Sequence, residues 1–180
     1  MKLQLHRVQI ISAVFIIVSV SSAAYITVAS INYLSFFPSL AELNSRIAKV
    51  AFIQGSNGAN LSATVTVDNP TDYSGFTVSD ISLKLYFEHT NASMMNQTLF
   101  RDQPLFGYQQ LNSDLGPRSK MVSNVYFSLN SQQLASLSDF NRTYYGQIFV
   151  HASLIVDIFT FLYSATGYTT LDIIQELPLL

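Results

Sequence analysis

Hydrophobic residues follow two patterns along this chain: a long uncharged and mainly apolar run near the start, and an alternation of apolar and polar positions further on. The run from Val8 to Ala41 has 34 residues and no Asp, Glu, Lys or Arg. A transmembrane helix needs about 20 apolar residues, so the run predicts a membrane-spanning helix over residues 8–37, with length left for tilt. Phe36, Phe37 and Pro38 are typical of a helix that leaves the bilayer, and we expect Pro38 to end it.

Beyond a linker at residues 38–46, apolar residues recur at every second position, which is the period of a half-buried β-strand. Each stretch is bounded by turn residues such as those of Asn69–Gly75. The apolar positions are Leu61, Ala63, Val65 and Val67; Ile81, Leu83, Leu85 and Phe87; Met121, Val125, Phe127 and Leu129; and, between Tyr144 and Tyr163, Ile148, Val150, Ala152, Leu154, Val156 and Ile158.

Weaker signals add strands at 47–54, 99–108 and 168–174, and Ser131 is expected to cap a short helical turn through Leu137. About seven short strands with few helices predict a mainly β fold, an immunoglobulin/fibronectin-like antiparallel β-sandwich, preceded by one N-terminal transmembrane helix. The expected organisation is therefore a basic cytoplasmic tail at 1–7, the helix at 8–37, the linker at 38–46 and the extracytoplasmic sandwich at 47–180.

Basic residues before the helix indicate its orientation. Lys2 and Arg7 lie on the N-terminal side, and such residues favour the cytoplasmic face. We therefore expect a single-pass signal anchor in the cell membrane, with the N-terminus in the cytoplasm and the domain outside. Two alternatives stay open. A secretory signal would be cleaved after Ser22-Ala23-Ala24, and a prepilin-like signal would be cleaved near Arg7 and leave the helix to pack in a filament.

Small residues mark one side of the predicted helix. Ser12, Ser19, Ala23 and Ser30 fall close to a single line along it. Because small residues let helices approach closely, this line predicts a helix-packing face for a partner in the membrane. The alternative is that these serines bond back to their own helix and face lipid.

The composition describes a polar surface with little charge. Asp, Glu, Lys and Arg make up 11% of the chain, against about 25% in ordinary soluble domains, whereas Ser, Thr, Asn and Gln number 57. Such a surface changes little with pH, which suits an acidic archaeal cell surface or a glycan-coated exterior. The net charge of −2 gives no reason to expect nucleic acid as a partner. The absence of cysteine excludes disulfides and thiolate chemistry.

Four sequons of the form Asn-x-Ser/Thr follow the predicted helix, which places all of them in the expected outer domain. We predict N-glycosylation at their asparagines, because such a motif on an exported domain is an acceptor for N-linked sugar. The four are Asn60-Leu61-Ser62, Asn91-Ala92-Ser93, Asn96-Gln97-Thr98 and Asn141-Arg142-Thr143.

Candidate catalytic groups are few. His89 adjoins Glu88, and His151 lies near Asp157, but neither grouping has the spacing of a metal-ligand pair such as His-x-x-x-His. The sequence has no Gly-x-Ser-x-Gly elbow, no glycine-rich phosphate loop and no cysteine nucleophile. We therefore expect no catalytic residues, no metal and no cofactor.

One stretch resembles a known family. Val65 to Tyr73 contains a strand that ends in Asn69-Pro70, and Phe76 to Phe87 supplies the next strand. This arrangement resembles the water-stress domain of the group 2 late embryogenesis abundant proteins, and the turn at Leu115–Lys120 is similar to a later turn of that family. The resemblance covers about residues 47–175. It implies an immunoglobulin-like or fibronectin-like sandwich, often on an N-terminal membrane helix, and it implies no catalytic residues.

These observations predict a non-enzymatic structural or interaction protein of the cell envelope. Its expected partners are membrane lipid and other membrane or envelope proteins, bound by edge strands or loops of the sandwich. The alternative is a subunit of a hetero-oligomeric assembly: an accessory chain of a membrane oxidoreductase, or a pilin-like or archaellum-associated component of a filament.

Overall fold

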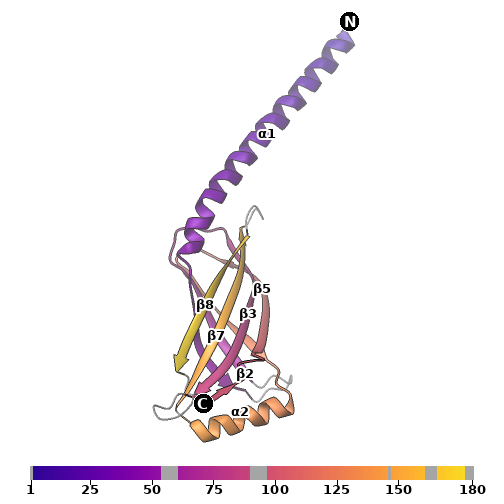
Figure 1. The fold of residues 1–180 in the computed structure, drawn as a ribbon. Coiled ribbons are helices and arrows are strands. Elements are labelled where there is room, and N and C mark those ends of the chain that lie inside the picture. The colour runs from indigo at the N-terminus through magenta and orange to yellow at the C-terminus, as the bar shows by residue number, and fades with distance from the viewer. Residues whose placement is uncertain (1, 54–60, 90–96, 146, 161–165, 177–180) are drawn as a thin grey trace.

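The structure is a computed structural model, and it describes residues 2–53, 61–89, 97–145, 147–160 and 166–176. A long helix stands away from a β-rich domain, and a second helix lies across the far end of that domain (Figure 1). In chain order the elements are α1 (Lys2–Ala41), β1 (Asn44–Phe52), β2 (Leu61–Asn69), β3 (Phe76–His89), β4 (Gln97–Leu99), β5 (Leu105–Leu115), β6 (Ser119–Phe127), α2 (Ser131–Tyr144), β7 (Ile148–Thr160) and β8 (Thr166–Glu176).

The strands form two antiparallel sheets. One has three strands in the order β1-β2-β6, and the other has five, in the order β4-β3-β7-β8 with β5 also paired to β3. The expectation of a mainly β, antiparallel fold after one long apolar helix is thus confirmed. Because β5 and β6 belong to different sheets, the three-residue turn between them carries the chain from one sheet to the other.

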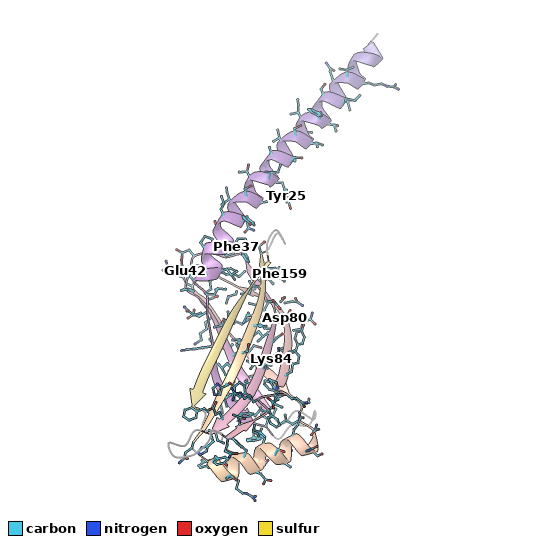
Figure 2. All side chains as sticks on the ribbon, viewed as in Figure 1. Tyr25, Phe37, Glu42, Asp80, Lys84 and Phe159 are labelled. Atoms are coloured by element: carbon cyan, nitrogen blue, oxygen red, sulfur yellow. The ribbon has the colours of Figure 1, made fainter. Side chains whose placement is uncertain are left out.

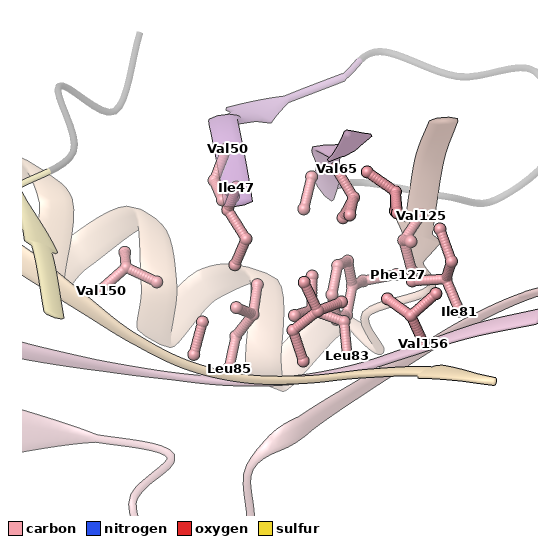
Figure 3. Packing of buried hydrophobic residues seen from close by; sticks show 14 of the residues in the cluster. Ile47, Val50, Val65, Ile81, Leu83, Leu85, Val125, Phe127, Val150 and Val156 are labelled. Carbon is pink, nitrogen blue, oxygen red and sulfur yellow. The ribbon is translucent and has the colours of Figure 1, made fainter. Parts of the chain in front are cut away.

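The two-residue alternation predicts correctly which side chains enter the core. Val65 of the three-stranded sheet is 1% exposed and Leu83 of the five-stranded sheet is 0% exposed, and Figure 3 shows side chains from both sheets meeting in one apolar cluster. Every predicted inward position on β2, β3 and β7 is buried. On β6, Val125 and Phe127 are buried, and Met121 is half-buried.

The expectation that Pro38 ends the helix is wrong. Helix α1 contains Pro38 and continues to Ala41, and β1 begins at Asn44. Proline fixes a backbone angle that is compatible with a helix, and near a C-terminus it removes a single hydrogen bond. The helix then closes with tighter bonds from the Glu42 and Leu43 amides to the carbonyls three residues earlier. Two residues therefore stand between helix and sheet where the sequence predicted a linker at 38–46.

Two local features also differ from the sequence-based expectation. The second helix is longer than one turn, and its cap is Asn130 rather than Ser131: the Asn130 side chain accepts from the Gln133 amide at 2.8 Å, and the Gln133 side chain accepts from the Asn130 amide at 3.0 Å. The alternation also predicts an unbroken strand through Ile81, whereas β3 has a β-bulge in which Ser79 is an extra residue opposite the Asp157–Ile158 step.

We predict that Gly107→Ala destabilises the domain by about 1–3 kcal/mol through overpacking. A Cβ at Gly107 would lie 2.7 Å from Val125 Cγ1 and 2.8 Å from the Phe127 ring, and both side chains are buried and unable to give way. The matched control is Gly116→Ala, whose Cβ would meet Ser119 Oγ at an ordinary 3.6 Å. Chemical denaturation of both variants measures the effect, and equal stabilities would contradict the close approach of β5 to β6.

Candidate functional site: the joint between helix and sandwich

Helix α1 is exposed over most of its length. Every residue from 8 to 28 is exposed, and the first buried one is Asn32. The 24 residues from Val8 to Ile31 extend about 36 Å, enough to cross a hydrocarbon layer of about 30 Å with some tilt. The stretch Arg7–Ala41 is long and apolar enough to cross a membrane. Figure 2 shows Tyr25 on the free part of the helix, with Phe37 and Glu42 at its junction with the domain.

An aromatic cluster fixes the end of α1 to the sandwich. Phe36 is 0% exposed, and its ring centroid lies 5.7 Å from that of Phe76 and 6.1 Å from that of Tyr73. Tyr73 and Phe76 contact each other edge to face at 4.6 Å. Leu43, just past the helix, is also buried in the core. The last turns of α1 are therefore packed as part of the domain.

A partly buried hydrogen bond also joins α1 to the sandwich. The Tyr73 hydroxyl donates to Asn32 Oδ1 at 2.5 Å, and Asn32 is 5% exposed. Burial raises the pKa of Tyr73 above its ordinary value of 10.0, and the hydrogen bond to Asn32 opposes this in part. The phenol thus stays protonated and remains a donor at neutral pH. Because hydrogen bonds require specific geometry, this pair fixes the rotation of α1 against the sandwich.

Asn69 organises the loop that carries Tyr73. Its side-chain amide donates to the carbonyls of Tyr73 at 2.9 Å and of Gly116 at 2.8 Å. Its Oδ1 accepts from the Thr71 amide at 3.0 Å and from the Thr71 hydroxyl at 2.7 Å. Asn69 is 0% exposed, and its partners Thr71, Tyr73 and Gly116 are half-buried, so all four bonds are partly shielded from water. One side chain therefore ties the end of β2, the loop after it and the β5–β6 turn together.

A second link joins the same two loops at the surface. The Arg118 amide donates to the Thr71 carbonyl at 2.9 Å, and Arg118 Nε lies 2.7 Å from Asp72 Oδ1. The hydrogen bond from Arg118, and then its charge, lower the pKa of Asp72, and Asp72 raises the pKa of Arg118 in return. Both side chains are well exposed, so this pair orients the loops but contributes little stability.

The sequence analysis singled out Phe36 at the end of the helix and Asn69 in a turn, but it did not bring these residues together in one joint. Phe36 was expected at a membrane interface and instead lies in the core, whereas Tyr33 and Phe37 stay exposed. Asn32 had a readable signal, because it is an amide near the end of the mainly apolar run and Phe36 follows one helical turn later on the same side. The role of Tyr73 depends on a contact across 41 positions, which no local pattern reports.

The four predicted glycosylation sites fall in two groups. Asn60, Asn91 and Asn96 lie outside the described residues. Asn141 lies within α2 rather than in a turn, and its Oδ1 is buried with no hydrogen-bond partner among the described atoms. Thr143 of the same sequon donates to the Asp139 carbonyl at 2.8 Å.

The predicted helix-packing residues all lie on the exposed part of α1. Ser12, Ser19, Ala23 and Ser30 are each exposed to the surroundings of the helix. Within the same segment, the Thr27 hydroxyl donates to the Ala23 carbonyl at 2.9 Å, so a hydroxyl beside this line bonds back to its own helix. Packing against a partner helix stays a prediction.

The structure pairs the histidines differently from the sequence. His151 Nε2 lies 2.7 Å from Glu88 Oε2, and the His151 ring stacks on Tyr86 at 4.4 Å. His89 is 4% exposed, with Nδ1 3.0 Å from the Gln147 carbonyl and the ring stacked on Tyr144 at 4.1 Å. These contacts account for both rings as parts of the packing. The described ranges contain no group of three or more potential metal-binding side chains.

Two carboxyl groups face each other on the outer side of the five-stranded sheet. Asp80 and Asp157 are direct partners in the β3–β7 ladder. Partial burial raises the pKa of Asp157 above 3.8, and a hydrogen bond with Asp80 and the charge of Asp80 raise it further. Like charges this close favour one shared proton.

This pair predicts a pH dependence of stability. A carboxyl whose pKa is higher in the folded state stabilises the fold fully below its unfolded value of 3.8, and this contribution is lost as the pH rises through the folded pKa. Asp157→Asn removes the effect. We therefore expect the free energy of unfolding of the wild type to fall relative to that of the variant between about pH 4 and pH 7. Urea unfolding across this range measures it, and a constant difference would contradict the assignment.

Comparisons with known proteins reveal distant similarity in structure and none in sequence. No protein-family model matches the chain, and no curated protein matches it significantly. A protein from Archaeoglobus fulgidus is 11% identical with a TM-score of 0.41, and the match covers 77% of this chain and 98% of the other. A protein from Arabidopsis thaliana is 13% identical with a TM-score of 0.41, over 76% and 82% of the two chains.

A third solved structure is described as a late embryogenesis abundant protein, the group that the sequence resembles. It is 15% identical with a TM-score of 0.41, and the match covers 89% of this chain and 87% of the other. Similarity at this level carries no argument about function, so the proposal below depends on the joint between helix and sandwich.

Proposed function

We propose that this chain is a non-catalytic, single-pass membrane protein that holds a β-sandwich of immunoglobulin or fibronectin type rigidly at the outer surface of the cell membrane. There the sandwich binds another component of the cell envelope. The observation that carries the proposal is the joint itself: a free apolar helix of membrane-spanning length ends in a turn that is buried within the domain through Asn32 and Phe36.

The joint supports anchoring at a fixed orientation over flexible tethering. A tether would need a polar, exposed linker, whereas Glu42 and Leu43 alone separate α1 from β1, and Leu43 is buried. The basic residues Lys2 and Arg7 support a cytoplasmic N-terminus. A rigid attachment limits the directions in which the sandwich presents its faces, which favours binding within the plane of the membrane.

Glycosylation belongs to the same proposal, because it requires the domain to face outward. Intact mass above the 20.0 kDa of the chain, falling stepwise as Asn60, Asn91, Asn96 and Asn141 are changed to Gln, is the expected result. Since Asn141 lies in a helix and sequons are typically modified in surface loops, we expect its occupancy to be the lowest of the four.

Topology is the most direct test of anchoring. Protease added to intact cells is expected to digest the sandwich and spare a membrane-embedded fragment that ends near Ala41, because bilayer and joint protect α1. Cells opened by detergent provide the control, in which the helix is digested as well. A sandwich fully protected in intact cells would contradict the outward orientation, and release of the whole chain by alkaline carbonate would contradict the anchor.

A further inference from the structure

The outer face of the five-stranded sheet is acidic. Its described charged residues are Asp80 and Glu88 on β3, Asp114 on β5 and Asp157 on β7, against one lysine, Lys84. His151 on the same face contacts Glu88. Asp80 and Lys84 lie along this sheet in Figure 2. We call this surface the acidic face.

Two large aromatic side chains add an apolar contact area to the acidic face. Phe106 is 59% exposed and Tyr108 is 50% exposed. Both belong to β5, and in the ladder they lie opposite Lys84 and Ser82 of β3. Large exposed aromatic groups on an ordered strand are typical of binding surfaces.

The outer face of the three-stranded sheet has the opposite charge. Arg46 and Lys49 on β1 and Lys120 on β6 are exposed there, against one described carboxylate, Asp68. We call this surface the basic face. It also has an exposed apolar pair, Val122 at 61% and Tyr126 at 49%, both on β6. Outside α1, four of the five large hydrophobic side chains exposed in the described part of the chain thus lie on these two faces.

We propose that the acidic face of one copy of this chain binds the basic face of a neighbouring copy in the same membrane. Each face offers an exposed apolar pair and a charge opposite to that of the other face, and opposite charges across an interface favour binding and select its register. Two acidic faces, or two basic faces, would place like charges together, which disfavours a symmetric dimer. The inference depends on the proposed function, because anchoring gives all copies the same orientation.

The geometry of this contact predicts rows of molecules. A contact between two different faces is head-to-tail, so each added copy leaves a free face at either end of the row. The smaller sheet has three strands of nine residues, which gives a flat area of about 400 Å². That is below the roughly 800 Å² per partner of a stable complex. The contact is therefore weak in solution and gains strength from confinement in the membrane.

Cross-linking of the full chain in membranes tests the proposal, since the chain has no cysteine of its own. Tyr108→Cys and Val122→Cys, carried on chains with tags of different size, are co-expressed and treated with a bifunctional thiol reagent. We expect a product that joins the two tags, at least several-fold above the self-linked product of either variant alone. Ala135→Cys on α2, an exposed position away from both faces, replaces one partner as the background control. Phe106→Cys with Tyr126→Cys repeats the test at a second pair of positions.

Charge provides the second arm of the experiment. Lys120→Glu in the Val122→Cys chain is expected to reduce the mixed product several-fold, and so is high salt. Efficient self-linking by a single variant, or a mixed product no greater than the Ala135→Cys background, would overturn the proposal. Carbonate extraction of the same membranes tests the membrane anchor independently of cross-linking. Release of the chain would contradict the proposed function. Retention of the chain without any mixed product would contradict only the self-association.

Discussion

Leu83→Asp is expected to unfold the sandwich, whereas Lys84→Asp, one position along the same strand, is expected to leave it folded. Leu83 is 0% exposed and lies between Gly107 of β5 and Leu154 of β7. An unpaired carboxylate there costs several kcal/mol, a large part of the roughly 5–15 kcal/mol by which a domain is stable. Lys84 faces solvent on the outer side of the same sheet.

Circular dichroism and urea unfolding of the full chain in mild detergent measure this contrast. Val65→Asp with Thr64→Asp repeats the comparison in the three-stranded sheet, where Val65 is buried and Thr64 is half-buried on the outer side. The result to expect is loss of the cooperative transition in Leu83→Asp and Val65→Asp alone. Equal tolerance at both members of a pair would show that the register of that strand is wrong.

Asn69→Ala is expected to destabilise the domain by about 3 kcal/mol and to loosen the joint. The change leaves the Tyr73 and Gly116 carbonyls without the donors that Asn69 Nδ2 supplies, and removes the acceptor of the Thr71 amide and hydroxyl. Each buried polar group that loses its partner costs about 1–3 kcal/mol, and partial access of water reduces the sum.

The matched control is Asn124→Ala, which removes the same chemical group from an exposed position on β6. Asn124 accepts one bond, from the Thr64 hydroxyl at 2.8 Å, so a change within about 0.5 kcal/mol is expected. Denaturation of both variants measures the difference in free energy of unfolding. If Asn69→Ala were as mild as Asn124→Ala, Asn69 would not organise the loop.

The strands were predictable because the side chains that each strand buries are visible in its own sequence. A strand that is covered on one face alternates apolar and polar residues, and this pattern is visible in Leu61–Val67, Ile81–Phe87 and Ile148–Ile158 without knowledge of the rest of the chain. The apolar start of the chain is equally local, since length and absence of charge suffice to identify a candidate membrane helix.

The joint was not predictable, because it depends on contacts between distant parts of the sequence. Asn32 contacts Tyr73, and Asn69 contacts Gly116. No local pattern in the sequence indicates that these residues form pairs. The prediction that the helix ends at Pro38 was wrong for a related reason. Proline is a local signal for a helix end, but packing of Phe36 and Leu43 into the core holds the last turn of α1 in place. Tertiary contacts override such local preferences.

The rigidity of the joint can be measured as a spin-label distance between helix and sandwich. Tyr25→Cys and Lys84→Cys, both exposed, carry the two labels in one chain, which is diluted with unlabelled chain in lipid vesicles so that distances within one molecule dominate. Because the joint is rigid, we expect a single narrow distance distribution, which broadens in Asn69→Ala. A broad distribution in the wild type, of the kind that a flexible linker produces, would contradict a rigid joint.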